Sequence, residues 1–293
     1  MKLRHLAASL LLTACTLSLA NAQTLVDDRF IDGGVSNGTD PLELDVAWFT
    51  NGASSSLSVV SDNSTGPNEG SNDNAIAVNT ASQGFRGAAG NMTTGANLSA
   101  TNYYVSLRLD VRYTADPANV DAGFRFGLFS SNGTTVAANN DGLSNNDIGY
   151  GARFSVGTAT ANVSLSERVS GTGGALSGAG IGILSSATAN VTSLNGTTNY
   201  YRLQLDIVRN GSNGLDFTIS EGVNTTTLTQ VLTFTDTTAS TFLFDSVVFT
   251  NGNTVANYAV DNVLITTGIP EPSTALSLLA GFGLFGLIRR RRA

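Results

Sequence analysis

Residues 103–113 read Y-Y-V-S-L-R-L-D-V-R-Y and alternate between apolar and polar side chains. The apolar set consists of Val105, Leu107, Leu109, Val111 and Tyr113, and the residues between them are Ser, Arg, Asp and Arg. Because successive side chains of a β-strand point to opposite faces, this run predicts a strand with one dry and one solvated face. Such strands are typical of antiparallel sheets that pack against a second sheet.

Further candidate strands occur along the chain between short turn clusters. They lie at residues 124–128, 153–156, 161–169, 200–208, 215–220, 228–234, 241–250 and 258–266. Asn-Gly pairs such as Asn132-Gly133 and Asn251-Gly252 supply the left-handed positions that tight turns need. No stretch keeps a 3.6-residue period, so residues 23–268 are predicted to form an all-β domain, an antiparallel sandwich.

Two segments of this domain echo each other. Thr101-Asn102-Tyr103-Tyr104 leads to Leu-Asp-Val at 109–111, and Thr198-Asn199-Tyr200-Tyr201 leads to Leu-Asp-Ile at 205–207. The echo is out of step by one residue, so we interpret the segments as two equivalent strands. Trp48 is expected to be a buried anchor, and residues 61–74, which are polar and rich in Asn, a loop.

The strand pattern resembles a concanavalin-like, laminin-G-like jelly-roll β-sandwich. The resemblance lies in the order of the strands and in two edge motifs, Asp27-Asp28-Arg29-Phe30 and Tyr258-Ala259-Val260-Asp261-Asn262-Val263. It implies that the first and last strands lie close together. It implies no particular function, because lectins, glycosidases and inert wall domains share this fold.

The N-terminus has the features of an export signal. Lys2 and Arg4 precede an apolar stretch at 6–19, and Ala20-Asn21-Ala22 is a small-x-small cleavage site, so residues 1–22 are expected to be a signal peptide. An alternative is a lipoprotein signal, because Leu12-Thr13-Ala14 precedes Cys15, which would then be lipidated.

The C-terminal residues 269–293 combine three unlike pieces. Pro270-Glu271-Pro272 ends the domain, an uncharged apolar run extends from Ala275 to Ile288, and Arg289, Arg290, Arg291 and Arg292 follow. The run from Ser273 would span only roughly 24 Å as a helix, short of a typical ~30 Å hydrocarbon core. Arginines after such a run are expected to stay cytoplasmic, with the preceding domain outside.

This tripartite order resembles the PEP-CTERM sorting signal of Gram-negative bacteria. The resemblance implies processing by the membrane enzyme exosortase and export alongside exopolysaccharide, as in biofilm. The chain would be anchored transiently in the inner membrane by a short transmembrane helix, with its body periplasmic, and would then reach the outer surface or the extracellular matrix. An ordinary C-terminal membrane anchor is the alternative.

The body between these two ends contains nine arginines, no lysine, and twenty-one acidic residues, a formal net charge of −12. This charge argues against nucleic acid as a partner. The body also lacks histidine and cysteine, which excludes Ser-His-Asp and Cys-His catalysis and the usual zinc sites. We therefore predict no catalytic residues. Glycoside hydrolysis, which needs only two carboxylates, is the remaining enzymatic alternative, with Glu167 and Glu221 as the residues to test.

Two candidate binding features remain. The loop 139–147 offers carboxylate, amide and carbonyl oxygens, and Asp141, Asn145 and Asp147 are candidate calcium ligands; a second such cluster surrounds Asp73. The alternative is a polar turn without metal. Tyr150, between Gly149 and Gly151, is a candidate glycan contact if its ring is exposed, or a tyrosine packed on the rim of the sandwich.

The leading interpretation is a non-enzymatic exported surface or matrix protein. A carbohydrate-binding module of the same fold is the first alternative, and a secreted glycosidase is the second. No cofactor other than calcium is expected.

Overall fold

The alternating run at 103–113 forms strand β6 (Tyr104–Tyr113) of the computed structural model. Its inward residues Val105, Leu107, Leu109 and Val111 are buried in the core, while Ser106 and Arg108 face the other side. The structure describes residues 22–35, 44, 46–51, 55–61, 74–80, 86–113, 120–139, 147–157, 160–169, 176, 180–195, 197–211, 213–252 and 257–268. Residues 24–267 form one compact unit, to which the following description refers.

The described residues form fifteen strands and no helix, which confirms the all-β prediction. The strands are β1 (Gln23–Asp28), β2 (Trp48–Asn51), β3 (Ser55–Ser61), β4 (Asn74–Thr80), β5 (Arg86–Asn97), β6 (Tyr104–Tyr113), β7 (Val120–Ser130), β8 (Ile148–Val156), β9 (Val163–Arg168), β10 (Ile181–Ala187), β11 (Tyr200–Arg209), β12 (Leu215–Val223), β13 (Thr229–Asp236), β14 (Leu243–Asn251) and β15 (Tyr258–Gly268).

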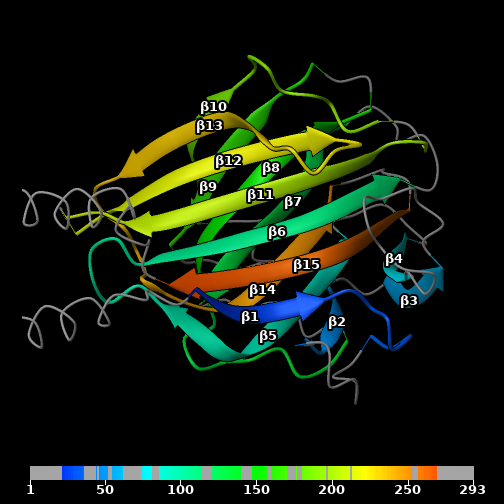
Figure 1. Ribbon diagram of the computed structural model, residues 1–293, viewed down its shortest axis with the longest axis horizontal. Coiled ribbons are helices and arrows are strands. Elements are labelled where there is room, and N and C mark those ends of the chain that lie inside the picture. Colours follow the sequence, from blue (N-terminus) through cyan, green and yellow to red (C-terminus); the bar gives the residue numbers. More distant parts are fainter. Residues whose placement is uncertain are drawn as a thin grey trace, which may run out of the picture. The chain divides into compact units, whose positions relative to one another are not determined.

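The strands make two antiparallel sheets that lie face to face (Figure 1). Sheet A, in front in Figure 1, has the order β13-β12-β11-β6-β15-β4-β3, and β1 also pairs with β15. Sheet B, behind it, has the order β10-β9-β8-β7-β14-β5-β2. The pairing of β1 with β15 confirms that the first and last strands lie together, as the concanavalin-like jelly roll requires.

The echoing segments are neighbours in sheet A. They form β6 and β11, which pair antiparallel with Tyr104 opposite Val208 and Tyr200 opposite Arg112. The inward side chains of both strands belong to one large apolar core between the sheets. The two segments are therefore equivalent strands, as interpreted from the sequence.

Strand β14 is buried on both faces. Phe244, Val247 and Phe249 belong to the central core, whereas Val248 lies on the outer face of sheet B, in a small cluster with Val136 and Leu176. A strand with apolar residues on both faces must be covered on both, and here the loops that carry Val136 and Leu176 supply the second cover.

Trp48 joins the first strand of sheet A to sheet B. Its indole Nε1 donates a hydrogen bond of 2.7 Å to Asp28 Oδ2, and its ring lies 5.0 Å from that of Phe249 between centroids. The side chain is buried, which confirms the expected anchor. Asp28 is buried too, and it also accepts a hydrogen bond from the backbone N–H of Phe30.

Candidate functional site

Several residues singled out from the sequence lie outside the described residues. They are the sorting residues Pro270, Glu271 and Pro272, the segment from Ala275 to Ile288, Arg289–Arg292, and the calcium candidates Asp141 and Asn145. The last described strand, β15, ends at Gly268, directly before this C-terminal segment. Among the described residues there is no helix long and apolar enough to cross a membrane.

Tyr150 is not exposed, and the expectation of a ring available for glycan stacking is wrong. It lies in β8 with an exposed fraction of 0%, because β8 points it inward between the two sheets together with Ala152 and Phe154. The ring packs against Phe217 of β12 at 4.7 Å between centroids. The side chain is packed, as in the alternative interpretation, but it lies between the two sheets and not on the rim.

The hydroxyl of Tyr150 is the centre of a polar cluster that links the sheets. Its Oη lies 3.0 Å from Glu167 Oε1 of β9 and 3.0 Å from Asp236 Oδ2 of β13. The backbone N–H of Ser240 donates to Tyr150 Oη at 3.0 Å and lies 3.2 Å from Glu167 Oε1. Burial raises the pKa of Tyr150 well above its usual value, and the two nearby carboxylates raise it further. The hydroxyl therefore keeps its proton and acts as a donor.

The cluster contains two carboxylates that approach each other through one hydroxyl. Since both contact Tyr150 Oη at 3.0 Å, their nearest oxygens are at most 6 Å apart. A pair at such a separation resembles the arrangement that glycoside hydrolysis uses. Asp236, however, is buried and also accepts hydrogen bonds from the N–H and hydroxyl of Thr238. The Asp236 carboxylate therefore makes its hydrogen bonds within the fold.

The second glutamate of the glycosidase alternative, Glu221, lies elsewhere. It is near the end of β12, six residues after Leu215, which pairs with Asp236. Six residues of strand correspond to about 20 Å, so Glu167 and Glu221 do not form a catalytic pair. Glu221 is buried and its Oε1 accepts a hydrogen bond of 2.7 Å from the backbone N–H of Thr192. Burial raises the pKa of Glu221.

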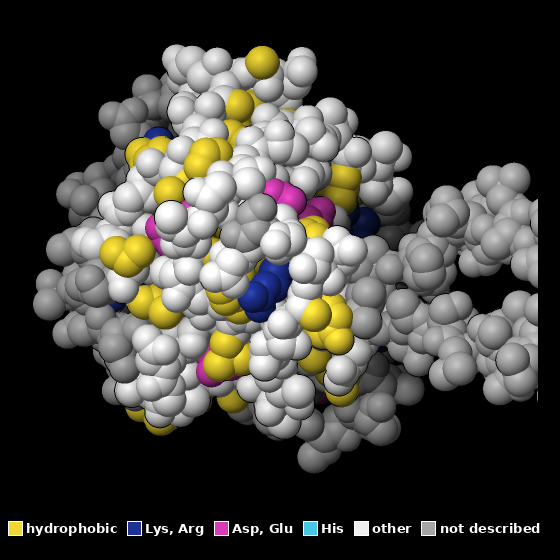
Figure 2. Space-filling model, turned by 90° about the vertical axis from the view of Figure 1, so that its left-hand side faces the viewer, with side chains coloured by type: hydrophobic (Ala, Val, Ile, Leu, Met, Phe, Trp, Pro, Cys, Tyr) yellow, Lys and Arg dark blue, Asp and Glu magenta, His cyan; other side chains and the backbone are white. Residues whose placement is uncertain are grey.

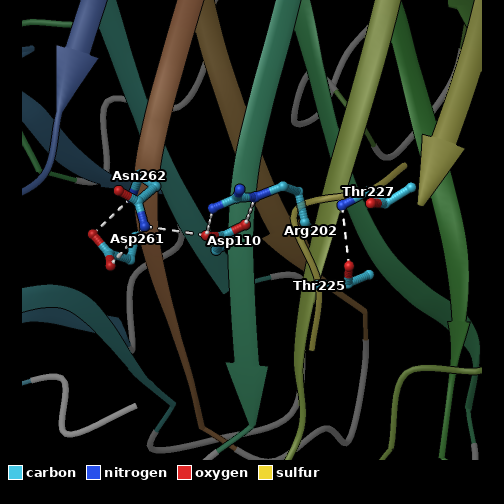
Figure 3. Close-up of polar contacts among 6 residues, drawn as sticks. All are labelled: Asp110, Arg202, Thr225, Thr227, Asp261 and Asn262. Atoms are coloured by element: carbon cyan, nitrogen blue, oxygen red, sulfur yellow. Dashed lines mark hydrogen bonds and ion pairs between the residues drawn. The ribbon is translucent and has the colours of Figure 1, made fainter. Parts of the chain in front are cut away.

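A second polar network, on the outer face of sheet A, was not predicted (Figure 3). Arg202 of β11 donates two hydrogen bonds to Asp110 of β6, from Nε to Oδ1 at 2.8 Å and from Nη2 to Oδ2 at 2.6 Å. Asn262 of β15 donates from Nδ2 to Asp110 Oδ2 at 3.1 Å and to Asp261 Oδ2 at 3.1 Å. The pair is in register across β6 and β11, and its side chains are only 7% and 8% exposed.

At Asn262 the alternation of β15 changes, so that different positions of the strand point into the core before and after it. Asn262 has a φ of 52°, in the left-handed region, and the inward positions change from Tyr258 and Val260 before it to Val263 and Ile265 after it. One extra residue inserted in this way is the mark of a β-bulge. Asn tolerates this conformation, which gives the Asp-Asn pair of the closing motif a structural role.

Of the three calcium candidates in the 139–147 loop, only Asp147 is among the described residues. Asp147 is buried directly before β8, and its backbone carbonyl accepts a hydrogen bond of 3.0 Å from Arg168 Nε. In the described ranges no group of three or more His, Cys, Asp or Glu side chains could hold a metal ion. Calcium binding by the 139–147 loop therefore stays a prediction.

Uncharged groups dominate the end of the sandwich where β11, β13 and β15 end (Figure 2). Basic atoms gather near the centre of this view, and acidic and apolar side chains are scattered around them. At the same end of β11, the Arg209 guanidinium lies over the ring of Phe242, 4.1 Å from its centroid. This view presents no broad basic surface of the kind that nucleic acid requires.

Comparison with known families identifies the C-terminal segment. Residues 268–292 match the family model described as the PEP-CTERM protein-sorting motif. The chain therefore carries the sorting motif that its sequence resembles, which marks an exported protein that is sorted to the cell surface and implies processing by exosortase. A comparison with curated proteins found no match.

Solved structures of similar fold include both binding proteins and an enzyme. The carbohydrate recognition domain of Emp47p is 12% identical, with a TM-score of 0.47, 84% of this chain and 95% of that chain being covered. A galectin-like protein of unknown function from Bacillus subtilis is 8% identical, with a TM-score of 0.46 and coverages of 86% and 99%. The PL-14 alginate lyase from Aplysia kurodai is 11% identical, with a TM-score of 0.44 and coverages of 72% and 86%. The order of the strands in the two sheets defines the fold without these similarities.

Proposed function

We propose that this protein is a non-enzymatic component of the cell surface or extracellular matrix, delivered by exosortase and associated with exopolysaccharide. The observation that carries the proposal is the match of residues 268–292 to the sorting motif, directly after the body. Strand β15 ends at Gly268, so cleavage within Pro270–Thr274 would remove no described strand and no core residue. Before cleavage, the apolar run from Ala275 to Ile288 anchors the chain transiently in the inner membrane.

The non-enzymatic part of the proposal is supported by how the body uses its carboxylates. Glu167 and Asp236 contact Tyr150 and backbone N–H groups, and Glu221 accepts a hydrogen bond from the backbone of Thr192. Each of these side chains holds together strands or loops of the sandwich. A secreted glycosidase is less well supported, since the close pair Glu167–Asp236 is bonded to a tyrosine that is 0% exposed.

The sorting proposal is tested in a cell that carries the exosortase. The variant in which Pro270, Glu271 and Pro272 are all replaced by alanine is expected to remain in the inner-membrane fraction, whereas the unmodified chain reaches the outer surface or the medium. Ser273→Ala is the control, because it alters the same segment but leaves the three motif residues intact. Inactivating the exosortase is expected to reproduce the triple variant. Unchanged surface delivery in both cases would contradict the proposal.

A further inference from the structure

The outer face of sheet B carries a row of four side chains across adjacent strands, here called the arginine row. It consists of Thr250 of β14, Arg125 of β7, Arg153 of β8 and Ser164 of β9, which lie opposite one another in register. Their sequence neighbours Phe249, Phe124, Phe154 and Leu165 point into the core, so the row faces away from it. With strands about 4.8 Å apart, the row extends over roughly 14 Å.

The two central members of the row carry the same charge. Arg125 and Arg153 are direct cross-strand partners, and like charges at such positions repel each other. The body has twenty-one acidic residues and only nine arginines, so an acidic neighbour for each would be easy to supply. Within the described ranges, however, Arg153 makes no ion pair and no hydrogen bond. A repulsive pair kept in this way indicates a role other than stabilising the sheet.

Glycines shape the sheet around these arginines. Gly127 and Gly151 are partners beside the row, and a Cβ on Gly151 would lie 2.2 Å from Leu176 Cδ2. The side chain of Leu176 lies over Gly151, and its backbone carbonyl accepts a hydrogen bond from Arg125 Nη1. At the bulge of β7, a Cβ on Gly123 would lie 3.2 Å from Arg153 Cγ. The arginine stems are thus packed, and Arg125 is held on the side of Leu176.

The row also contains a hydroxyl that lacks a partner. Ser164 is 1% exposed, and its Oγ has no hydrogen-bond partner in the described part of the chain. Buried polar atoms without partners are costly and uncommon in folded proteins. Next to Arg153, this hydroxyl is a second donor that a ligand oxygen would satisfy.

The charge on Arg125 is destabilised in the folded protein. Burial, and to a smaller extent repulsion by Arg153, lower the pKa of Arg125 to about 10. A bound anion would oppose both effects, since it returns a favourable interaction to the charged guanidinium.

We propose that Arg125, Arg153 and Ser164 form a binding site for the oxyanion groups of an acidic polysaccharide. The guanidinium fork matches planar carboxylates and also sulfates in bidentate geometry, and the Ser164 hydroxyl lies on the strand next to Arg153. The inference rests on the proposed function only in taking an extracellular polymer as the source of the anion. Nucleic acid fits less well, because its dense charge is repelled by a body of net charge −12.

The experiment measures binding of polygalacturonate to the purified protein by calorimetry at low salt. Arg153→Gln is expected to weaken binding at least about tenfold, since it removes a charge-assisted bidentate contact. Arg29→Gln is the matched control: it removes the same charge from an arginine whose ion pair with Asp27 is only half-buried, and binding is expected to change less than about twofold. Arg153→Gln should not lower the melting temperature, because it removes the repulsion on Arg125.

Binding of other ligands to the unmodified protein identifies which anionic group the site recognises. Binding of polygalacturonate but not of its methyl ester would support a carboxylate site, and equal binding of dextran sulfate would extend it to sulfate. Binding of free galacturonate as well would show that a single acidic sugar suffices. No binding of any acidic polymer, equal loss in Arg153→Gln and Arg29→Gln, or tighter binding of duplex DNA would overturn the proposal. Because purified protein is used, these outcomes do not depend on whether exosortase sorts the chain.

Discussion

The hydroxyl of Tyr150 in sheet B lies 3.0 Å from the carboxylate of Asp236 in sheet A, at the edge where β13 lies beside β9 and β10. At the other edge of the sandwich, the indole of Trp48 in sheet B donates to the carboxylate of Asp28 in sheet A. Each edge of the sandwich is thus closed by a buried aromatic donor on sheet B and an aspartate on sheet A. These contacts fix how the two sheets are placed around their shared apolar core.

Replacing Tyr150 by phenylalanine should show what the first of these contacts contributes. The change keeps the ring against Phe217 but leaves Asp236 and the Ser240 N–H without the hydroxyl. We expect a loss of about 1–3 kcal/mol in the free energy of unfolding, measured with denaturant. Tyr104→Phe, at a half-buried tyrosine of β6, should change it by less than about 0.5 kcal/mol. Equal stability of the two variants would show that the contact is not important.

The buried ion pair of Asp110 and Arg202 gives a second stability prediction. Asp110→Asn should cost about 3–5 kcal/mol, because it leaves the Arg202 charge buried without its counter-charge. Replacing both residues by leucine should cost less than the single change, because no buried charge is left unbalanced. The control is Asp206→Asn, on the same face of β11, where the carboxylate contacts Gln204. A double variant less stable than Asp110→Asn would contradict the prediction.

Glu221 should make stability depend on pH, because burial raises its pKa above the ordinary 4.5. Below pH 4.5 the carboxyl is protonated in both the folded and the unfolded chain, and it contributes no difference. As the pH rises, the unfolded chain ionises freely while the folded chain resists, so stability falls up to the raised pKa.

Glu221→Gln should therefore be more stable than the unmodified protein at pH 7 and equal to it below pH 4.5. Glutamine keeps an oxygen that can accept from the Thr192 N–H. Melting temperatures across this range provide the measurement, and Asp32→Asn, at an exposed carboxylate, is the control. A difference that is largest in acid would contradict a raised pKa of Glu221 in the folded protein.

Calcium binding by the 139–147 loop can be tested by thermal unfolding with and without a chelator. If the loop binds the ion, calcium at about 100 times its dissociation constant should stabilise the fold by about 2.7 kcal/mol, and Asp141→Asn should abolish this gain. The Asp141→Asn variant tests the loop itself, since Asp141 is a predicted calcium ligand. An unchanged melting temperature on addition of chelator would remove calcium from the account.

The sequence predicted those strands whose side chains alternate, and the structure explains why others were missed. Strand β6 alternates because one face is dry, and it was found. Strand β5 reads R-G-A-A-G-N-M-T-T-G-A-N and shows no alternation. Gly87 lies against Phe249 of β14 and Gly90 against Val46, just before β2, so closely that a Cβ would approach their atoms within 2.0 Å. Small residues were selected there by packing, which a single sequence does not display.

The candidate site was harder to predict than the fold. The glycines on both sides of Tyr150 left open an exposed ring, but positions 149 and 151 need glycine because Phe129 and Leu176 pack closely against them. The in-register meeting of Asp110 with Arg202, and of Arg125 with Arg153, depends on which strands become neighbours. Residues far apart in sequence come together only through that pairing, although the echo of β6 and β11 was one signal of it.

Mass spectrometry of the mature protein's C-terminus tests the central claim, export through the sorting motif, most directly. The account predicts a chain that retains Gly268 and ends, or is joined to another group, within Pro270–Thr274, so that Arg289–Arg292 are absent. The same spectrum reports whether the mature N-terminus is Gln23 or a lipidated Cys15. A mature surface protein that still contains Arg289–Arg292 would contradict the account.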